Sequence, residues 1–247
     1  MEYFTVITEG RAGSSLLISS LNSHPEILCF PEVLADLSDE WQDRVLDAIV
    51  KGKSFSNLSR LAEDRRYFHR SPGDRSGALQ IGFKVKLSQV GRLRKFATYL
   101  DERNYSLIYL TRKNIVRAAI SEIRAEALRK AHGVSNASRA SQVIGRIRID
   151  PSALMEEVIS RLHREEIHTA FFDAYPGRKE RFDYSELQTD PSNVFGLVLR
   201  FLGVSQRELV GKFHKNTPQD LEAAIENFEE IRDLLSGTSY ADLLKAV

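Results

Sequence analysis

Short apolar segments alternate with longer amphipathic ones along the chain. The segment Tyr3–Thr8 is rich in β-branched residues, a composition typical of a buried parallel strand. Segments of similar length predict further strands at Ile27–Phe30, Ile81–Lys86, Ser106–Thr111 and Arg181–Tyr184. The predicted strands therefore spread over most of the sequence.

The segments between these strands carry apolar residues at the three- and four-residue spacing of amphipathic helices. Helices are predicted at about residues 14–21, 35–55, 90–100, from 114, at 155–172 and at 217–235. The apolar side of the second comprises Leu37, Trp41, Val45, Leu46 and Ile49. The last is predicted to begin at Thr217–Asp220, which offers a capping threonine and an early proline. Gly237 stands where a C-terminal cap belongs.

Strands that alternate with helices predict an α/β fold. We expect a single domain over residues 1–247, with a P-loop-like, three-layer architecture in which helices flank a mostly parallel central sheet. Hydrophobic residues make up 42% of the sequence, which is enough for a substantial core.

Composition excludes several classes of function. The 35 Lys and Arg residues nearly balance the 34 Asp and Glu residues, which argues against nucleic acid or an acidic membrane as a general partner. The single cysteine, Cys29, excludes an internal disulfide and a cysteine-rich zinc site. Because the sequence shows no signal-peptide pattern and no long apolar stretch, we expect a cytoplasmic protein without integral membrane association.

A glycine-rich loop joins the first predicted strand to the first helix. Gly13 lets the backbone approach a ligand closely, and the N–H groups at a helix start face an anion. Ser14 and Ser15 add hydroxyl donors, and Arg11 adds a planar, charged fork. These features suit a terminal phosphate or phosphosulfate group; the other interpretation is an ordinary strand-to-helix turn.

The loop differs from that of nucleotide triphosphatases. Those proteins place a lysine after the last glycine and an acidic residue near magnesium, whereas Ser14 follows Gly13 here and Arg112 ends the Ser106–Thr111 strand. The loop therefore predicts an anionic nucleotide without a metal. A P-loop-like nucleotide kinase and a non-catalytic nucleotide-binding protein are the alternatives.

A second basic segment begins at Arg112. Asn114, Arg117 and Ser121 follow at helical spacing and share a face. Because α/β sheets bind ligands at the carboxyl ends of their strands, Arg112 and Ser121 are predicted to hold a second phosphate. The alternative is a basic helix start on the surface. Two anion sites suit a nucleotide that carries phosphates on both ends of its ribose.

Segments along nearly the whole chain resemble the sulfotransferase superfamily that uses 3'-phosphoadenosine-5'-phosphosulfate (PAPS), especially its bacterial carbohydrate- and nodulation-factor-type members. Thr8–Leu17 resembles the 5'-phosphosulfate motif, except that Ala12 replaces a frequent serine. Tyr109–Ser121 resembles the 3'-phosphate motif. Later segments that are similar to family signatures are Asp183–Leu187, Phe201–Val204 and Lys215–Phe228.

The resemblance implies that the chain is an enzyme that moves a sulfuryl group from PAPS, without a metal, to a hydroxyl or amine of a small acceptor. A glycan, a glycolipid or a secondary metabolite would serve as that acceptor. Arg11 would stabilise the leaving phosphate. The implied PAPS-binding residues are Arg11, Ala12, Gly13, Ser14, Ser15, Leu16, Arg112, Ser121 and Lys215.

Transfer to a hydroxyl requires a general base. Glu32 matches a glutamate base of some bacterial family members; the other interpretation is a helix-start carboxylate. His24 is the rival base, although a histidine at a helix end is more often structural. Lys84 is expected either to contact the phosphosulfate or acceptor from a strand end, or to be a solvated strand residue.

Residues 124–150 are strongly basic. The charged residues up to Arg148 are Arg124, Arg129, Lys130, Arg139, Arg146 and Arg148 against Glu126. This composition predicts either a solvated or mobile segment or an acceptor-side lid. His163 and His168 do not share a helix face, and both are predicted to lie at the surface.

Overall fold

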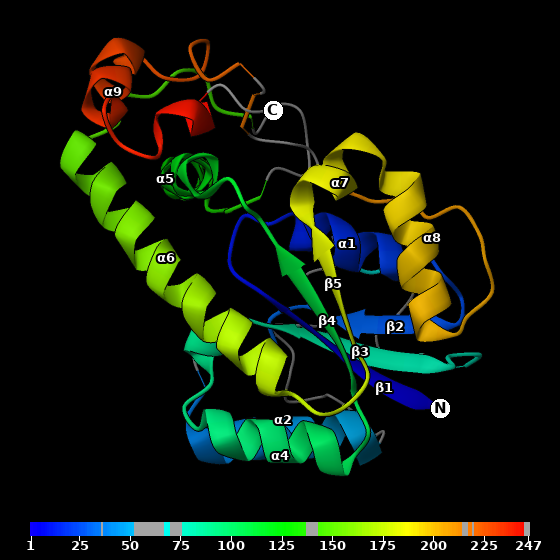
Figure 1. Ribbon diagram of the computed structural model, residues 1–247. Helices are drawn as coiled ribbons and strands as arrows, with labels where there is room; N and C mark the ends of the chain where they lie inside the picture. Colours follow the sequence, from blue (N-terminus) through cyan, green and yellow to red (C-terminus); the bar gives the residue numbers. More distant parts are fainter. Residues whose placement is uncertain are drawn as a thin grey trace. The chain divides into compact units, whose positions relative to one another are not determined.

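The central sheet has five parallel strands in the order β2-β3-β1-β4-β5 (Figure 1). The computed structural model describes residues 1–35, 37–51, 67–69, 76–136, 143–213, 217–218 and 220–244. The strands are β1 (Glu2–Thr8), β2 (Ile27–Phe30), β3 (Gln80–Val85), β4 (Ser106–Thr111) and β5 (Lys179–Asp183). Each predicted strand is confirmed, with bounds that differ by at most two residues.

Helices connect the strands and follow them. The α-helices are α1 (Ser14–Leu21), α2 (Asp39–Lys51), α4 (Leu93–Glu102), α5 (Ile115–His132), α6 (Pro151–Ala174), α7 (Tyr184–Thr189), α8 (Pro191–Leu202) and α9 (Phe228–Leu235). Short 3-10 helices lie at η1 (Leu87–Gln89) and η3 (Ala241–Leu244).

The α/β domain divides into two compact units. The first comprises Met1–Thr111 and Ile167–Lys212, and it holds the whole sheet. The second comprises Arg112–Glu166 and Phe213–Val247. In the first unit, α1, α7 and α8 cover one face of the sheet, and α2 and α4 cover the other (Figure 1). The predicted three-layer architecture with a parallel sheet flanked by helices is confirmed.

Side chains of β3 alternate between the two faces of the sheet. Phe83 packs against Phe96 of α4, with ring centroids 6.3 Å apart. Lys84 therefore points to the opposite face, which α1 covers. Gly82 shares that face, where an added Cβ would lie 2.4 Å from the ring of Phe4. The strand period thus places a lysine on a crowded, covered face near the carboxyl ends of the strands.

Helix α2 buries Val45, Leu46 and Ile49 as predicted, but not Trp41. Trp41 is 50% exposed, and the guanidinium of Arg44 lies 5.0 Å from its ring centroid. Gln42 is buried instead, at the i, i+3, i+4, i+7 spacing with Val45, Leu46 and Ile49. Its side-chain amide donates to the carbonyls of Leu37 (3.1 Å) and Gln89 (2.7 Å). These two hydrogen bonds compensate for the burial of a polar group on the apolar face.

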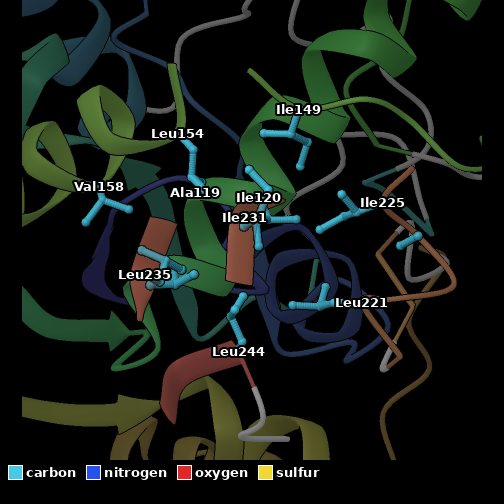
Figure 2. Packing of buried hydrophobic residues seen from close by; sticks show 12 residues of the cluster. Ala119, Ile120, Ile149, Leu154, Val158, Leu221, Ile225, Ile231, Leu235 and Leu244 are labelled. Atoms are coloured by element: carbon cyan, nitrogen blue, oxygen red, sulfur yellow. The ribbon is translucent and has the colours of Figure 1, made fainter. Parts of the chain in front are cut away.

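The second unit has its own hydrophobic core (Figure 2). Core side chains labelled in Figure 2 come from α5 (Ala119, Ile120), α6 (Leu154, Val158), the segment before α9 (Leu221, Ile225), α9 (Ile231, Leu235) and η3 (Leu244). The apolar periodicity predicted between residues 217 and 235 therefore identifies core positions correctly.

The predicted start of the last helix at Thr217–Asp220 is wrong, because α9 begins at Phe228. The preceding segment is held by other partners: Ile225 forms a parallel bridge with Ile147. The side chain of Asn227 accepts from the N–H of Ile149 and donates to its carbonyl, at 2.9 and 2.8 Å. Gly237 has the expected left-handed φ of 79° just after the helix.

Arg124 is 0% exposed, which contradicts the prediction that it belongs to a solvated basic surface. Its guanidinium donates to the carbonyls of Ile144 (2.9 Å), Gly145 (3.0 Å) and Ala224 (2.9 Å). One charged fork thereby joins α5 to two other segments of the second unit. Its burial lowers the pKa of the guanidinium.

Replacement of Arg124 should destabilise the protein far more than replacement of an exposed arginine on the same helix. Arg124→Ala leaves three carbonyls without their charged donor, that of Ala224 in the core, so the free energy of unfolding should fall by roughly 3–5 kcal/mol. Arg129 has a half-exposed side chain that pairs with Glu126. Arg129→Ala should therefore cost less than about 1 kcal/mol in urea unfolding. Equal losses would contradict this role for Arg124.

Candidate active site

The loop between β1 and α1 leaves the middle of the sheet. β1 lies between β3 and β4, and the hydroxyl of Thr8 donates to the carbonyl of Leu110 at 2.9 Å. The carboxyl ends of two neighbouring strands are thereby tied together where the loop begins. In parallel α/β sheets this edge is the usual place for a ligand.

The backbone of this loop has the conformation of a known type of anion-binding concavity. Arg11 (φ 69°) and Gly13 (φ 79°) take left-handed conformations, whereas Gly10 and Ala12 do not. Such alternation turns successive N–H groups toward one point, an arrangement known as a nest. Gly13 is also the N-cap residue of α1, and no side-chain hydrogen bond caps that helix. The helix start therefore adds its N–H groups and its positive dipole end.

Aromatic residues hold the loop in place. An added Cβ at Gly13 would lie 2.6 Å from the ring of Tyr184, so only glycine fits there. The hydroxyl of Ser15 forms a 3.0 Å hydrogen bond with the hydroxyl of Tyr67. Ala12 and Ser14 are buried, and Leu16 is half-buried. The predicted residues from Arg11 to Leu16 thus lie together in this loop and in the first turn of α1.

Glu32 lies in a cationic cluster in the same unit. Its Oε1 accepts from Lys84 Nζ at 2.6 Å, and its Oε2 accepts from Gln89 Nε2 at 2.8 Å. Lys86 Nζ lies 3.7 Å from Oε2. Burial raises the pKa of the Glu32 carboxyl, but the two lysines and the two hydrogen bonds outweigh it and lower the pKa to about 2. Glu32 is therefore firmly ionised.

Lys84 is buried, which excludes its interpretation as a solvated strand lysine. It is 3% exposed, and its ammonium pairs with the carboxylate of Glu32. The structure therefore brings together two of the residues selected from the sequence, although neither prediction included this ion pair. The pair lies on the face of the sheet that α1 covers.

The carboxyl ends of β4 and β5 are also tied together. The hydroxyl of Thr111 donates to Asp183 Oδ2 at 3.2 Å. Asp183 also accepts from the N–H of Ser185 at 2.8 Å and so caps α7. Because Arg112 directly follows Thr111 in the chain, its backbone begins at this edge of the sheet.

The start of α5 lies in the second unit. The side chain of Asn114 accepts from the N–H of Arg117 at 2.9 Å and caps the helix. Arg117 is buried and donates to the carbonyls of Leu244 (3.3 Å) and Pro218 (3.2 Å). Ser121 is also buried. Asn114 and Arg117 therefore have structural roles, and a phosphate site at Arg112 and Ser121 stays a prediction.

His24, the rival base, lies at the amino ends of the strands, whereas the loop lies at their carboxyl ends. It precedes β2, whose first residue is level with the starts of β3 and β1. Its Nδ1 accepts from the N–H of Glu26 at 3.1 Å, so Nε2 carries the proton and donates to the carbonyl of Ser205 at 2.9 Å. Both ring nitrogens thus hold backbone groups together, which gives His24 a structural role.

The two histidines that were predicted to lie at the surface differ in their exposure. His163 has an exposed side chain. His168 is buried, stacks on Tyr109 with ring centroids 6.0 Å apart, and accepts from the N–H of Leu87 at 3.3 Å through Nε2. The prediction for His168 is therefore wrong, because α6 turns that side chain onto the sheet.

Several neighbours of the site were not predicted. Lys86 follows Lys84 at the two-residue period of a strand, and this spacing was the available signal. Gln89 ends the short 3-10 helix η1 and Tyr67 lies in a bend, and neither position belongs to a periodic pattern. Lys215, predicted to bind PAPS, lies outside the described residues, as do residues 137–142 of the basic segment.

Comparisons with solved structures find distant similarity to sulfotransferases. One is a sulfotransferase from Alicyclobacillus acidocaldarius, with 16% identity and a TM-score of 0.46 over 100% of this chain and 97% of that chain. The sulfotransferase domain from the curacin biosynthetic pathway gives 16% identity and a TM-score of 0.46 over 84% and 76%. Mouse sulfotransferase SULT7A1, complexed with PAP, gives 12% and 0.45 over 84% and 61%.

No protein-family model and no curated protein matches the chain. At this level of similarity, the function has to be argued from the site itself. The narrower resemblance to carbohydrate- and nodulation-factor-type sulfotransferases stays a prediction.

Two features of the described residues bear on cofactors and membranes. Within that part of the chain, no three His, Cys, Asp or Glu side chains gather as a metal site. No helix there combines the length and apolar character needed to cross a membrane. A metal-free mechanism and a cytoplasmic location both stay predictions.

Gly13→Ala should destabilise the protein more than Gly203→Ala. Both glycines have a left-handed φ, a conformation that costs a residue with a Cβ about 1–2 kcal/mol. An added Cβ meets nothing within 4 Å at Gly203 but meets Tyr184 at Gly13. Overpacking should therefore make the loss at Gly13 larger by about 1–3 kcal/mol in urea unfolding. Equal losses would show that Tyr184 moves aside without cost.

Proposed function

We propose that this protein is a PAPS-dependent sulfotransferase. The observation that carries the proposal is the nest at residues 10–13, which joins the start of α1 and includes an arginine. A nest of N–H groups with a guanidinium fits a fully ionised phosphosulfate better than a neutral ligand. The sequence resemblance over the same residues and the distant structural similarities agree with this assignment.

PAPS supplies a sulfuryl group attached to its 5'-phosphate, and the residues present fit that end of the molecule. The backbone N–H groups of residues 11–15 would hold the phosphosulfate. The hydroxyl of Ser15, positioned by Tyr67, would add a further hydrogen bond. The guanidinium of Arg11 would stabilise the negative charge that develops on the phosphate oxygen.

Glu32 is proposed as the general base. A bond forms between the acceptor oxygen or nitrogen and sulfur, while the bond between sulfur and the phosphate oxygen breaks, and its electron pair leaves with PAP. The carboxylate of Glu32 takes the proton of the acceptor. Lys84, on the covered face of β3, would contact the transferred group or the acceptor.

Arg112 and Ser121 are proposed to bind the 3'-phosphate. The position of Arg112 directly after β4 supports this, because ligands of α/β sheets bind at strand ends. A guanidinium gives phosphate two parallel hydrogen bonds. Recognition of a 3'-phosphate would distinguish PAPS from the nucleotides that kinases use. Ser14, in place of the lysine of nucleotide triphosphatases, argues against a P-loop-like nucleotide kinase. The acceptor is proposed to be a small hydroxyl- or amine-bearing molecule or a carbohydrate.

Calorimetry with PAP and AMP tests the assignment, because AMP lacks only the 3'-phosphate. PAP should bind more tightly than AMP by about 10- to 150-fold, the equivalent of one charge-assisted hydrogen bond of about 1.5–3 kcal/mol. Arg112→Ala should remove most of this difference. Arg11→Ala should keep the preference for PAP and slow turnover with radiolabelled PAPS at saturating concentration.

Two results would contradict the proposal. Equal affinity of the wild-type protein for PAP and AMP would exclude a 3'-phosphate site. PAP binding without sulfuryl transfer to any of a panel of sugar, hydroxyl and amine acceptors would indicate a nucleotide-binding protein.

A further inference from the structure

Lys84 is buried, and among the described residues it makes fewer hydrogen bonds than its ammonium can donate. Its ammonium carries three N–H donors, and it is 3% exposed. Among the described residues, its hydrogen-bond acceptor is one carboxylate oxygen of Glu32, at 2.6 Å. A buried ammonium is stable only when its donors find acceptors, so further oxygen atoms would stabilise it.

Glu32 is a weak base while this ion pair exists. Proton transfer is most efficient when the pKa of the base lies near the working pH. The pKa of Glu32 is about 2, because Lys84 and Lys86 attract the ionised form and Lys84 and Gln89 donate hydrogen bonds to it. Among the described residues, the thiol of Cys29 also faces Lys84, and burial raises its pKa well above its ordinary value. The cluster thus opposes the chemistry proposed for Glu32.

Lys84 lies close to the nest in the first unit. In the sheet it is level with Val6, two residues before the end of β1, which is about 7 Å along the strand. It lies on the face of the sheet that α1 covers, and the first turn of α1 completes the nest. The flexible four-carbon chain of a lysine spans a distance of this order.

We propose that Lys84 restrains Glu32 in the PAPS-free protein and moves its ammonium onto an oxygen of bound PAPS, so that Glu32 accepts a proton only after PAPS has bound. This inference rests on the proposed function and adds an order of events to it. Binding of PAPS first would both supply the sulfuryl group and activate the base. It would also keep Glu32 inactive toward an acceptor that binds alone.

The sign of the change follows from the contacts. When Lys84 moves away, Glu32 loses its strongest attraction and its shortest hydrogen bond, while its burial remains. The carboxyl pKa should then rise from about 2 toward its ordinary value of 4.5. Lys86 and Gln89 remain beside the carboxylate and limit the rise.

Carbon-13 NMR of the full chain, labelled at the glutamate side-chain carboxyl carbons, measures this pKa directly. Glu32→Gln assigns the signal. In the protein alone, the Glu32 signal should stay constant between about pH 4 and pH 8, because the carboxyl is ionised throughout. With saturating PAPS and no acceptor, the pKa should rise toward 4.5, so the Glu32 signal should move as the pH falls from about 6 to about 4. A shift with PAP as well would identify the 5'-phosphate as the new partner of Lys84, and a shift with PAPS alone would identify the sulfuryl group.

Two lysine variants provide matched controls. Lys84→Met should raise the pKa of the Glu32 carboxyl in the protein alone and abolish the effect of PAPS on that pKa. Lys86→Met removes a cation 3.7 Å away but leaves the short pair intact, so PAPS should still shift the signal. A Glu32 signal that PAPS leaves unchanged, while calorimetry shows that PAP binds, would overturn the proposed movement of Lys84 and leave the proposed function standing. Failure of PAP to bind at all would overturn the proposed function, and with it the proposed movement of Lys84.

Discussion

The position of β1 in the middle of the sheet is the constraint on which the candidate site depends. β3 and β4 pair with its two sides, so the chain must turn sharply over the sheet edge to enter α1. Left-handed backbone at Arg11 and Gly13 makes that turn, and the same conformations point N–H groups toward one place. The anion site is thus a consequence of how a central parallel strand is connected to its helix.

The second feature of the site arises from the strand period. Alternation along β3 places Lys84 on a covered face, where an unpaired ammonium would be costly. Glu32, which follows β2, supplies the opposite charge, and Gln89 orients its other oxygen. The resulting carboxylate is well positioned but weakly basic. An anionic ligand in the neighbouring nest is the natural competitor for the lysine, which links the two halves of the site.

The sequence predicts the parts of this protein that depend on local pattern. Strand period and apolar composition identify all the strands of the sheet, and the glycine-rich pattern identifies the loop between β1 and α1. The errors occur where a tertiary contact outweighs a local preference. Gln42 replaces Trp41 inside because its amide satisfies two backbone carbonyls, and α9 starts late because Ile147 and Ile149 engage the preceding segment.

Burial of charged or polar groups was the least predictable feature. Arg124 lies in a basic stretch that suggests a solvated surface, yet three carbonyls from distant positions in the second unit surround it. His168 is buried for a similar reason, since the backbone of Leu87 offers it a donor. Lys84 and Glu32 could each be selected from the sequence, but their pairing depends on strand order, which no single segment encodes.

Backbone amide NMR of the whole chain, recorded during a titration with PAP, tests the central claim most directly. If the nest holds the 5'-phosphate, the N–H signals of residues 11–15 should move the most within the first unit, because charged hydrogen bonds deshield amide protons. The signal of His24, at the opposite edge of the sheet, should not move. Saturable binding of PAP that leaves the signals of residues 11–15 in place would contradict the account.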